Sequence, residues 1–182
     1  MAKQGQVIDL GNSGVRMTIT ISAKDTNGQL SQIEAVMQAG KKLPALPHYH
    51  PSQEERIEAI SGEMTTLVDG KIRKLKAGDS LIIHAGQVHN FWNEGVEPVS
   101  GRVEHRPDLG FQNFVTTLGG LVKDGKLKYD NSFSDKMQMA VVADYYKDFM
   151  ILPVPLRFVI KIVAAVGRNL GKKGYLPEYF EE

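Results

Sequence analysis

Hydrophobic and polar residues alternate along roughly the first hundred residues of the chain, a pattern typical of strands that bury one face. The segment 15–21 places Met17, Ile19 and Ile21 on one face, and the segment 33–37 repeats the alternation. Antiparallel sheets with one face on a core show this alternation. We therefore expect the N-terminal part of the chain to be mainly β.

Short turn sequences separate these alternating runs. Asn27 and Gly28 lie between the first two strands, and Asp69 and Gly70 lie between two later runs. The Asp-Gly pair is a strong hairpin signal, because its two-residue turn requires positive φ at both positions. Many short strands with such punctuation predict a barrel or a sandwich.

Beyond about Pro107 the spacing of apolar residues becomes helical. A first predicted helix carries an apolar stripe from Phe111 to Val122. A second has Asp135 as its predicted N-cap and carries apolar side chains through Phe149. The C-terminal part is therefore expected to be helical.

A third predicted helix runs from about Leu156 to Leu170, between Pro155 and Gly171. It is largely apolar apart from a narrow stripe of cations, which consists of Arg157, Lys161, Arg168 and Lys172. Such a helix either packs on the barrel, on the other helices or on a second subunit, or it lies on an anionic membrane surface along 156–172. We favour packing, because most amphipathic helices face a core. The helix is too short and too charged for a transmembrane segment.

Length and composition favour one domain with one core, since the chain has 182 residues of which 42% are hydrophobic. We divide it into a barrel over 1–108 and a helical extension over 109–182 that packs on the barrel and is not an independent domain. The net charge of +1 and the lack of a helix-turn-helix pattern argue against nucleic acid as a partner. The polar N-terminus shows no signal peptide, so a cytoplasmic location is the default expectation, and the absence of cysteine leaves the redox compartment open.

Three histidines and a glutamate form a candidate metal site, namely His48, His50, Glu55 and His89. In a strand, residues at i and i+2 share a face, so the first two histidines can point into one cavity. Neutral imidazole and carboxylate together suit Fe, Mn, Ni, Cu or Zn. Glu55 is preferred over Glu54 because an inward Glu54 would also turn Arg56 and Glu58 into the core.

The second half of this pattern is a glycine-bounded apolar strand that leads to His89 and Asn93. The two runs together are similar to the two motifs of the cupin superfamily, and the resemblance covers roughly residues 40 to 93 with several fixed spacings. The chain departs from the family pattern at two positions. The glycine before His48 is Gly40, two residues further back than usual, and His84 stands where the family has a corner proline.

The resemblance implies a double-stranded β-helix, a jelly-roll barrel that holds one divalent metal ion, either Fe, Mn, Ni, Zn or Cu. By the same resemblance, His48, His50, Glu55 and His89 are the metal ligands, and Glu55 is also the candidate catalytic base. The ligand arrangement resembles that of the cupin dioxygenases most closely. Cupins commonly dimerise through barrel edge strands, so a homodimer is expected.

Alternation also predicts which other side chains face the interior of the barrel. His105 points inward if Val103 does. His84 is expected to face solvent. The candidate pocket residues are Ile57, Met64, Thr66, Phe91, Asn93 and His105.

Two functions fit the sequence, because one fold supports many activities. The first is a metal-dependent enzyme, dioxygenase-like or isomerase- or cyclase-like, that acts on a small organic molecule. The alternative is a non-catalytic, metal-containing module that binds or senses a small molecule; an empty structural barrel is a third, weaker reading. An open coordination position that faces a pocket with a second ionisable group would favour the enzyme.

Overall fold

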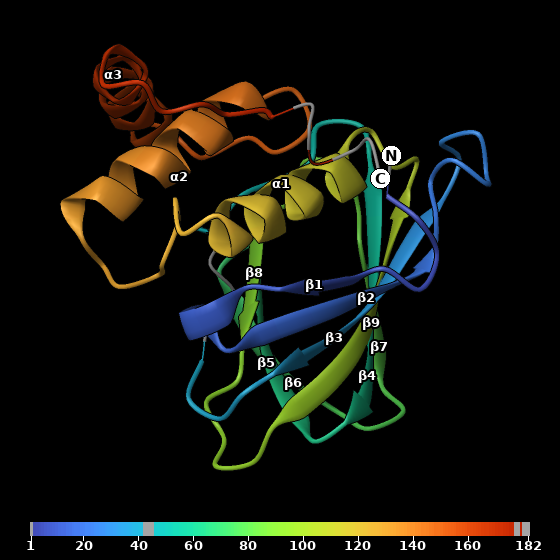
Figure 1. The fold of residues 1–182 in the computed structure, drawn as a ribbon. Coiled ribbons are helices and arrows are strands. Elements are labelled where there is room, and N and C mark those ends of the chain that lie inside the picture. The colour runs from blue at the N-terminus through green and yellow to red at the C-terminus, as the bar shows by residue number, and fades with distance from the viewer. Residues whose placement is uncertain (1, 42–45, 177–178, 180–182) are drawn as a thin grey trace.

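The computed structural model describes residues 2–41, 46–176 and 179 of the chain, and within them nine strands precede three helices (Figure 1). The strands are β1 Val7–Asp9, β2 Val15–Ile21, β3 Ser31–Met37, β4 Glu54–Ser61, β5 Glu63–Val68, β6 Lys71–Lys76, β7 Ser80–Ile83, β8 His89–Trp92 and β9 Val99–Arg106. The helices are α1 Phe111–Lys123, α2 Phe133–Tyr145 and α3 Leu156–Asn169, and a short 3-10 turn, Gly11–Ser13, follows β1.

The strands form two antiparallel sheets that face each other around a common interior (Figure 1). The larger sheet has the order β1-β2-β3-β9-β4-β7, and the smaller has the order β6-β5-β8. A bridge between His48 and His89 adds the segment before β4 to the edge of the smaller sheet. The predicted β-barrel followed by helices is therefore confirmed, although His48 and His50 lie in this short bridged segment and not in a regular strand.

Inward-facing apolar residues of both sheets share one core with the helices. Met17 and Ile19 are buried as the alternation predicts. Ile21 is only half-buried, because the β2–β3 register shifts between Ile19 and Ile21. The predicted hairpin is present, since β5 and β6 pair up to a turn at Asp69 and Gly70 with φ of 47° and 78°.

Helix α1 lies across one end of the barrel and closes it (Figure 1). Its apolar stripe, which includes Phe114, Leu118 and Leu121, belongs to the same hydrophobic cluster as Leu10 and Met17 of the barrel. The hydrophobic core of the extension is therefore continuous with that of the barrel. Helix α1 covers the end of the barrel interior that would otherwise face solvent.

Helix α2 begins differently from the prediction. Its N-cap is Ser132, whose hydroxyl accepts a hydrogen bond from the backbone N–H of Asp135 at 3.2 Å. The carboxylate of Asp135 instead accepts hydrogen bonds from the N–H groups of Lys128 and Asp130 and braces the preceding loop. The helix ends at Tyr145, so Phe149 lies beyond it.

Helix α3 packs on α2 through small residues. Ala164 and Gly167 are its buried residues, and a Cβ added at Gly167 would meet Val141 of α2 at 2.7 Å. Several large apolar residues of α3 remain exposed, so the expected burial of its apolar face is met only in part. No helix in the described part of the chain has the length and hydrophobicity needed to cross a bilayer.

We predict that Leu121→Ala lowers the free energy of unfolding by about 2–5 kcal/mol, because it removes a fully buried side chain of α1 from the shared core. Chemical denaturation followed by circular dichroism measures this change. Leu170→Ala, at a position that is 65% exposed, should change the stability little. Equal effects of the two substitutions would contradict a core shared between α1 and the barrel.

Candidate metal centre

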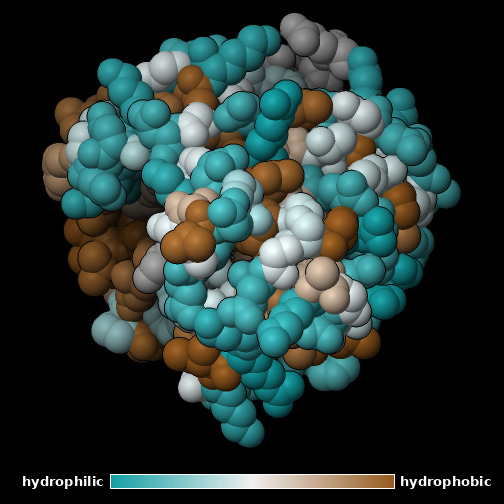
Figure 2. All heavy atoms as spheres, turned by 90° about the horizontal axis from the view of Figure 1, so that it is seen from below, coloured by the Kyte–Doolittle hydropathy of each residue, from teal (hydrophilic) through white to brown (hydrophobic). Residues whose placement is uncertain are grey.

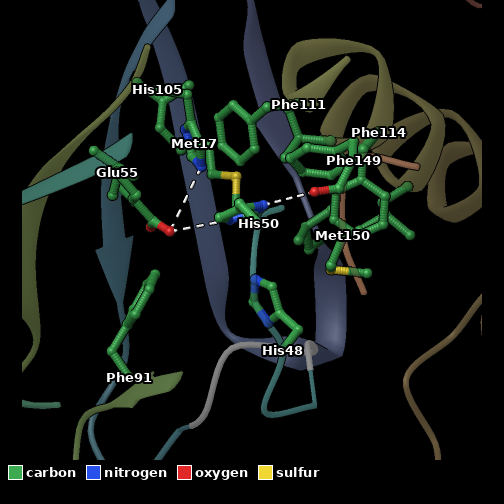
Figure 3. A pocket seen from close by; sticks show the side chains of 16 residues that line it. Met17, His48, His50, Glu55, Phe91, His105, Phe111, Phe114, Phe149 and Met150 are labelled. Carbon is green, nitrogen blue, oxygen red and sulfur yellow. Dashed lines mark hydrogen bonds and ion pairs between the residues drawn. The ribbon is translucent and has the colours of Figure 1, made fainter. Parts of the chain in front are cut away.

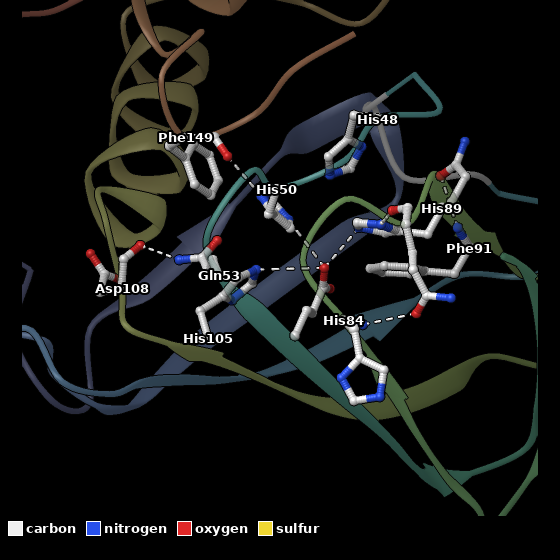
Figure 4. Close-up of polar contacts among 12 residues, drawn as sticks. His48, His50, Gln53, His84, His89, Phe91, His105, Asp108 and Phe149 are labelled. Atoms are coloured by element: carbon white, nitrogen blue, oxygen red, sulfur yellow. Dashed lines mark hydrogen bonds and ion pairs between the residues drawn. The ribbon is translucent and has the colours of Figure 1, made fainter. Parts of the chain in front are cut away.

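The candidate ligands come from both sheets and meet inside the barrel (Figure 4). His48 and His89 are bridge partners, with backbone N–H to carbonyl distances of 3.1 and 2.8 Å in the two directions. Glu55 on β4 pairs directly with His105 on β9 in the larger sheet. His50 lies between the two sheets, and its carbonyl accepts a hydrogen bond from Gly86. The structure therefore brings His89 to three residues that are close together in the sequence, His48, His50 and Glu55, and it adds His105 beside them.

All four are buried: His48 is 7% exposed, His50 and Glu55 are 2% exposed, and His89 is fully buried. Glu54, the neighbour that we rejected, carries a side chain that is 41% exposed and lies 3.5 Å from His84 at the surface. The alternation along β4 thus places Glu55 inside, and His84 lies outside the site as expected.

The backbone fixes the orientation of three imidazole rings. The Nδ1 atoms of His48, His50 and His89 lie 2.8, 2.8 and 2.9 Å from the carbonyl oxygens of Leu46, Phe149 and Gln87. A carbonyl only accepts hydrogen bonds, so each Nδ1 must donate. In each neutral ring the lone pair is then on Nε2, the arrangement found in histidine metal ligands.

A single carboxylate oxygen faces several of these nitrogens. Oε2 of Glu55 lies 2.8 Å from Nε2 of His89, 3.2 Å from Nε2 of His50 and 3.6 Å from Nε2 of His105 (Figures 3 and 4). Although Nε2 of His89 lies only 2.8 Å from the Glu55 carboxylate, it makes no well-directed hydrogen bond within the described structure. Lone pairs that converge in a buried site repel each other unless a cation, either a proton or a metal ion, lies among them.

Burial and mutual contact shift the pKa values of these groups. Burial, together with the charges of His89 and His50, lowers the pKa of His48 to about 3. Burial alone would raise the pKa of Glu55, but His89 and His105 hold that pKa well below its usual range. Burial opposes a charge on His89, yet Glu55 raises the pKa of that imidazole. In the metal-free site the histidines therefore favour the ionised form of Glu55, and Glu55 in turn favours a proton on His89.

The residues fit a divalent metal ion. One ligand atom from each of His48, His50, Glu55 and His89 lies within 4.8 Å of the others. Ligand atoms that are each about 2.1 Å from one ion lie at most about 4.2 Å apart, so a small contraction completes the site. Three imidazoles and a carboxylate without thiolate suit Fe, Mn, Ni, Cu or Zn. The donor set does not distinguish among these ions.

The site faces a small cavity of about 60 Å³ beneath α1. Figure 3 shows Phe111, Phe114 and Phe149 gathered on the helical side of this cavity, opposite Glu55. His105 stacks on the ring of Phe111 at a centroid distance of 3.8 Å. Apart from the histidines and Glu55, the described residues that line the cavity are apolar.

Two of the six predicted pocket residues, Phe91 and His105, line this cavity. The other four, Ile57, Met64, Thr66 and Asn93, are buried but do not line it. Ile57 lies two residues beyond Glu55 on β4 and pairs with Val103. At this level of the barrel, packed side chains fill the interior.

Three contacts explain the positions of the remaining candidates. The Cε of Met64 occupies the space beside Gly101. The hydroxyl of Thr66 donates to the carbonyl of Arg73. The side-chain amide of Asn93 donates to three backbone carbonyls, those of Met37, Gln38 and Glu97. Inward orientation alone could not show at which level of the barrel the cavity opens.

The part of the cavity wall that comes from the extension was not predictable from the spacing of the motif residues. Phe111, Phe114, Val115 and Leu118 of α1 line it, together with Phe149 and Met150. The apolar stripe of α1 was visible in the sequence, but its place over the barrel mouth was not. The backbone also ties this wall to the ligands, because Tyr49 and Ile151 exchange hydrogen bonds of 3.0 and 2.9 Å.

A larger hollow of about 330 Å³ lies next to this cavity. Phe114 and Met150 line both spaces, and Leu152 and Ile160 line the outer one. These two shared side chains therefore separate the metal cavity from a mainly apolar surface groove.

Comparison with known proteins shows what this barrel resembles. The profile of the family described as cupin domain matches residues 34–101. Because residues 34–101 lie within the two-sheet barrel, this part of the chain is similar to the cupin domain. No curated protein matches the chain.

Solved cupin structures resemble the chain over its barrel. A predicted oxalate decarboxylase from Thermotoga maritima is 19% identical, with 57% of this chain and 92% of that chain covered and a TM-score of 0.50. An RmlC-like cupin from Shewanella frigidimarina is 20% identical, with coverage of 59% and 87% and a TM-score of 0.49. A sugar phosphate isomerase from Silicibacter pomeroyi is 24% identical, with a TM-score of 0.44 and coverage of 51% of this chain and only 59% of its own. At these identities the likeness concerns the fold alone.

We predict that the metal-free protein loses stability as the pH falls from 6.5, the ordinary pKa of His48, towards the lowered value of about 3. Over this range the unfolded chain binds a proton at position 48 that the folded chain does not bind. One such proton lowers the free energy of unfolding by about 1.4 kcal/mol per pH unit. His48→Gln should flatten the slope by up to that amount in urea titrations at several pH values.

The dependence of stability on pH should have the opposite sign at His89, because the pKa of this imidazole is raised in the folded state. Its contribution to stability is fully present below its ordinary pKa and is lost as the pH rises through the raised value. His89→Gln should therefore remove a stabilisation that the wild type shows at acidic pH. The same pH slope in both variants would contradict the assigned charge states.

Proposed function

We propose that the chain is a metal-dependent enzyme that acts on a small, mainly apolar organic molecule, which binds the metal through its own oxygen atoms. The observation that supports this most strongly is the convergence of His50, His89 and His105 on one oxygen of Glu55 at the wall of an otherwise apolar cavity. In this proposal His48, His50, Glu55 and His89 hold the ion. Four protein ligands leave one or two positions open in a five- or six-coordinate site.

A second ionisable group beside the ligands favours an enzyme over a binding module. His105 is 1% exposed, and its Nδ1 has no hydrogen-bond partner within the described residues. Burial lowers the pKa of His105, so the imidazole is neutral near pH 7 and can accept a proton. Glu55 is the weaker base, because its pKa is held low. We therefore assign proton transfer to His105 and metal binding to Glu55.

The apolar wall restricts the class of substrate. No Lys or Arg is present among the described residues that line the cavity, so a phosphate group would have no cation to bind except the metal itself. Phe149 and Met150 exclude water from the ligands, and the flexible Met150 can move to admit a larger molecule from the adjacent groove. When bound, the ion supplies Lewis-acid or redox chemistry. This combination fits dioxygenase-like chemistry better than the isomerisation of a phosphorylated sugar.

We predict about one Fe, Mn, Ni, Zn or Cu ion per chain in untagged protein, measured by plasma mass spectrometry. The double variant His48→Ala/His89→Ala should fold but lose the ion, since two of four ligands are gone. His84→Ala/His105→Phe is a matched control that also removes two histidines, yet it should keep the metal. Metal-free wild type, even after reconstitution with each ion, would overturn the proposal.

Activity is tested by oxygen uptake of the iron-loaded protein with molecules that combine an apolar body and two adjacent oxygen donors, such as catechols and β-diketones. Substrate-dependent uptake that the double variant lacks supports a dioxygenase. Conversion of the substrate without oxygen uptake would assign the site to isomerase or cyclase chemistry. Tight binding without any conversion would favour the binding module.

We predict that His105→Phe keeps the metal but lowers kcat by about 100-fold, the usual scale for loss of a proton-transfer group. It should also remove the acidic limb of the pH profile of kcat/KM. His105→Gln preserves a hydrogen-bond donor towards Glu55 but cannot accept a proton at that position. Recovery of full activity in His105→Gln would show that His105 only positions Glu55.

A further inference from the structure

Helix α3 has three distinct faces. The inner face contacts α2 and contains the buried Ala164 and Gly167 with the partly buried Ile160 and Val163. At 100° per residue, the cations Arg157, Lys161 and Arg168 form a second stripe beside it, whereas Lys172, which the sequence pattern placed in this stripe, lies beyond the end of the helix. The third face lies opposite α2 and is apolar.

The apolar face is open to solvent. It consists of Phe158, Val159, Ile162, Val166 and Leu170, whose exposed fractions range from 46% at Val166 to 68% at Ile162. Hydrophobic residues gather along the flank of the molecule on which α2 and α3 lie (Figures 1 and 2). A continuous exposed apolar face of this kind marks an interaction surface.

The segment that carries this face contains cations and no carboxylate, although Arg168 pairs with Asp144 of α2. Residues 149–176 contain five cations and no Asp or Glu. The whole chain carries a net charge of +1, and this segment carries +5, so the residues outside the segment together carry a net charge of −4. The net positive charge of the protein therefore comes from the segment that exposes apolar side chains.

We propose that α3 docks on an anionic membrane surface, with Phe158 and Ile162 inserted among the lipids and the cationic stripe against the head groups. An interfacial helix needs an apolar face to insert and cations beside it to bind anionic lipids. The cations lie along one margin of the apolar face. Because α2 packs on the opposite side of α3, the barrel does not obstruct the approach of a flat surface (Figure 1).

The C-terminal end of the face borders a polar hollow of about 440 Å³. Leu170 lines it together with Lys126, Lys128, Lys172 and Lys173, and Asp130 and Asp135 line it as well. The lining of the hollow therefore has more cations than carboxylates.

A second copy of this chain fits the face less well. A symmetric dimer interface places the same patch of both subunits against each other. The cationic stripes of α3 would then approach without a carboxylate from 149–176 to oppose them, and Asp144 already pairs with Arg168 at 2.7 Å. An anionic bilayer satisfies both the apolar face and the charge.

The test is co-sedimentation of the full chain with vesicles of phosphatidylcholine alone or with 30% phosphatidylglycerol, a composition of about one anionic lipid in three. We expect binding to the anionic vesicles, at least tenfold weaker binding to neutral ones, and weaker binding in high salt. Phe158→Ser/Ile162→Ser should reduce binding at least tenfold. Ile72→Ser, at a position on β6 that is 65% exposed, is the matched control and should not change it.

The charge is tested separately. Arg157→Gln/Lys161→Gln should weaken binding to anionic vesicles by about fivefold per cation and reduce its salt dependence. Lys71→Gln/Lys76→Gln, which removes two exposed cations of β6, should have no effect. Circular dichroism and metal content should stay as in the wild type for all variants.

Two outcomes would overturn this proposal. One is equal, negligible sedimentation with both kinds of vesicle. The other is a concentration-dependent dimer in analytical ultracentrifugation that Phe158→Ser/Ile162→Ser dissociates, which would assign the face to self-association. Neither outcome affects the proposed metal chemistry, because α3 contributes no candidate ligand.

Discussion

The burial of one ionised carboxylate is the constraint on which the interior of this protein depends. Glu55 is 2% exposed, and an isolated charge in such a place is very costly. The walls of the cavity are otherwise apolar, so compensation has to come from the histidines and the cation that they share. Backbone carbonyls then fix His48, His50 and His89 through Nδ1, which leaves Nε2 directed at the centre. The ligand set is thus held by the main chain and not only by side-chain packing.

The helical extension is part of this arrangement and not an accessory to the barrel. Helix α1 supplies the roof of the cavity, and the carbonyl of Phe149 orients His50. The bridge between Tyr49 and Ile151 holds that carbonyl in register with the ligand segment. The extension therefore acts at two levels, since it excludes water from the metal site and also selects the tautomer of one ligand.

Local patterns in the sequence predicted the strands, the Asp69–Gly70 hairpin, the helices and the inward position of Glu55, because each depends on periodicity or on turn geometry. The level of the cavity within the barrel was not predictable in the same way. Ile57 and Met64 face inward as expected, but they fill the barrel below the site, since the packing of opposite sheets decides where space remains. The role of Phe149 depends on a contact across 99 residues, which no local pattern reveals.

That long-range contact also sets the order in which the interior can be completed during synthesis. All nine described strands are present once Arg106 has been made, whereas His50 obtains its carbonyl partner only when Phe149 arrives. Closing such a large loop is slow compared with the pairing of neighbouring strands. A nascent chain therefore passes through a stage in which the barrel exists without its roof and its histidines remain open to solvent. The candidate metal site is then completed in two steps, because its barrel residues are in place before Phe149 and Met150 cover them.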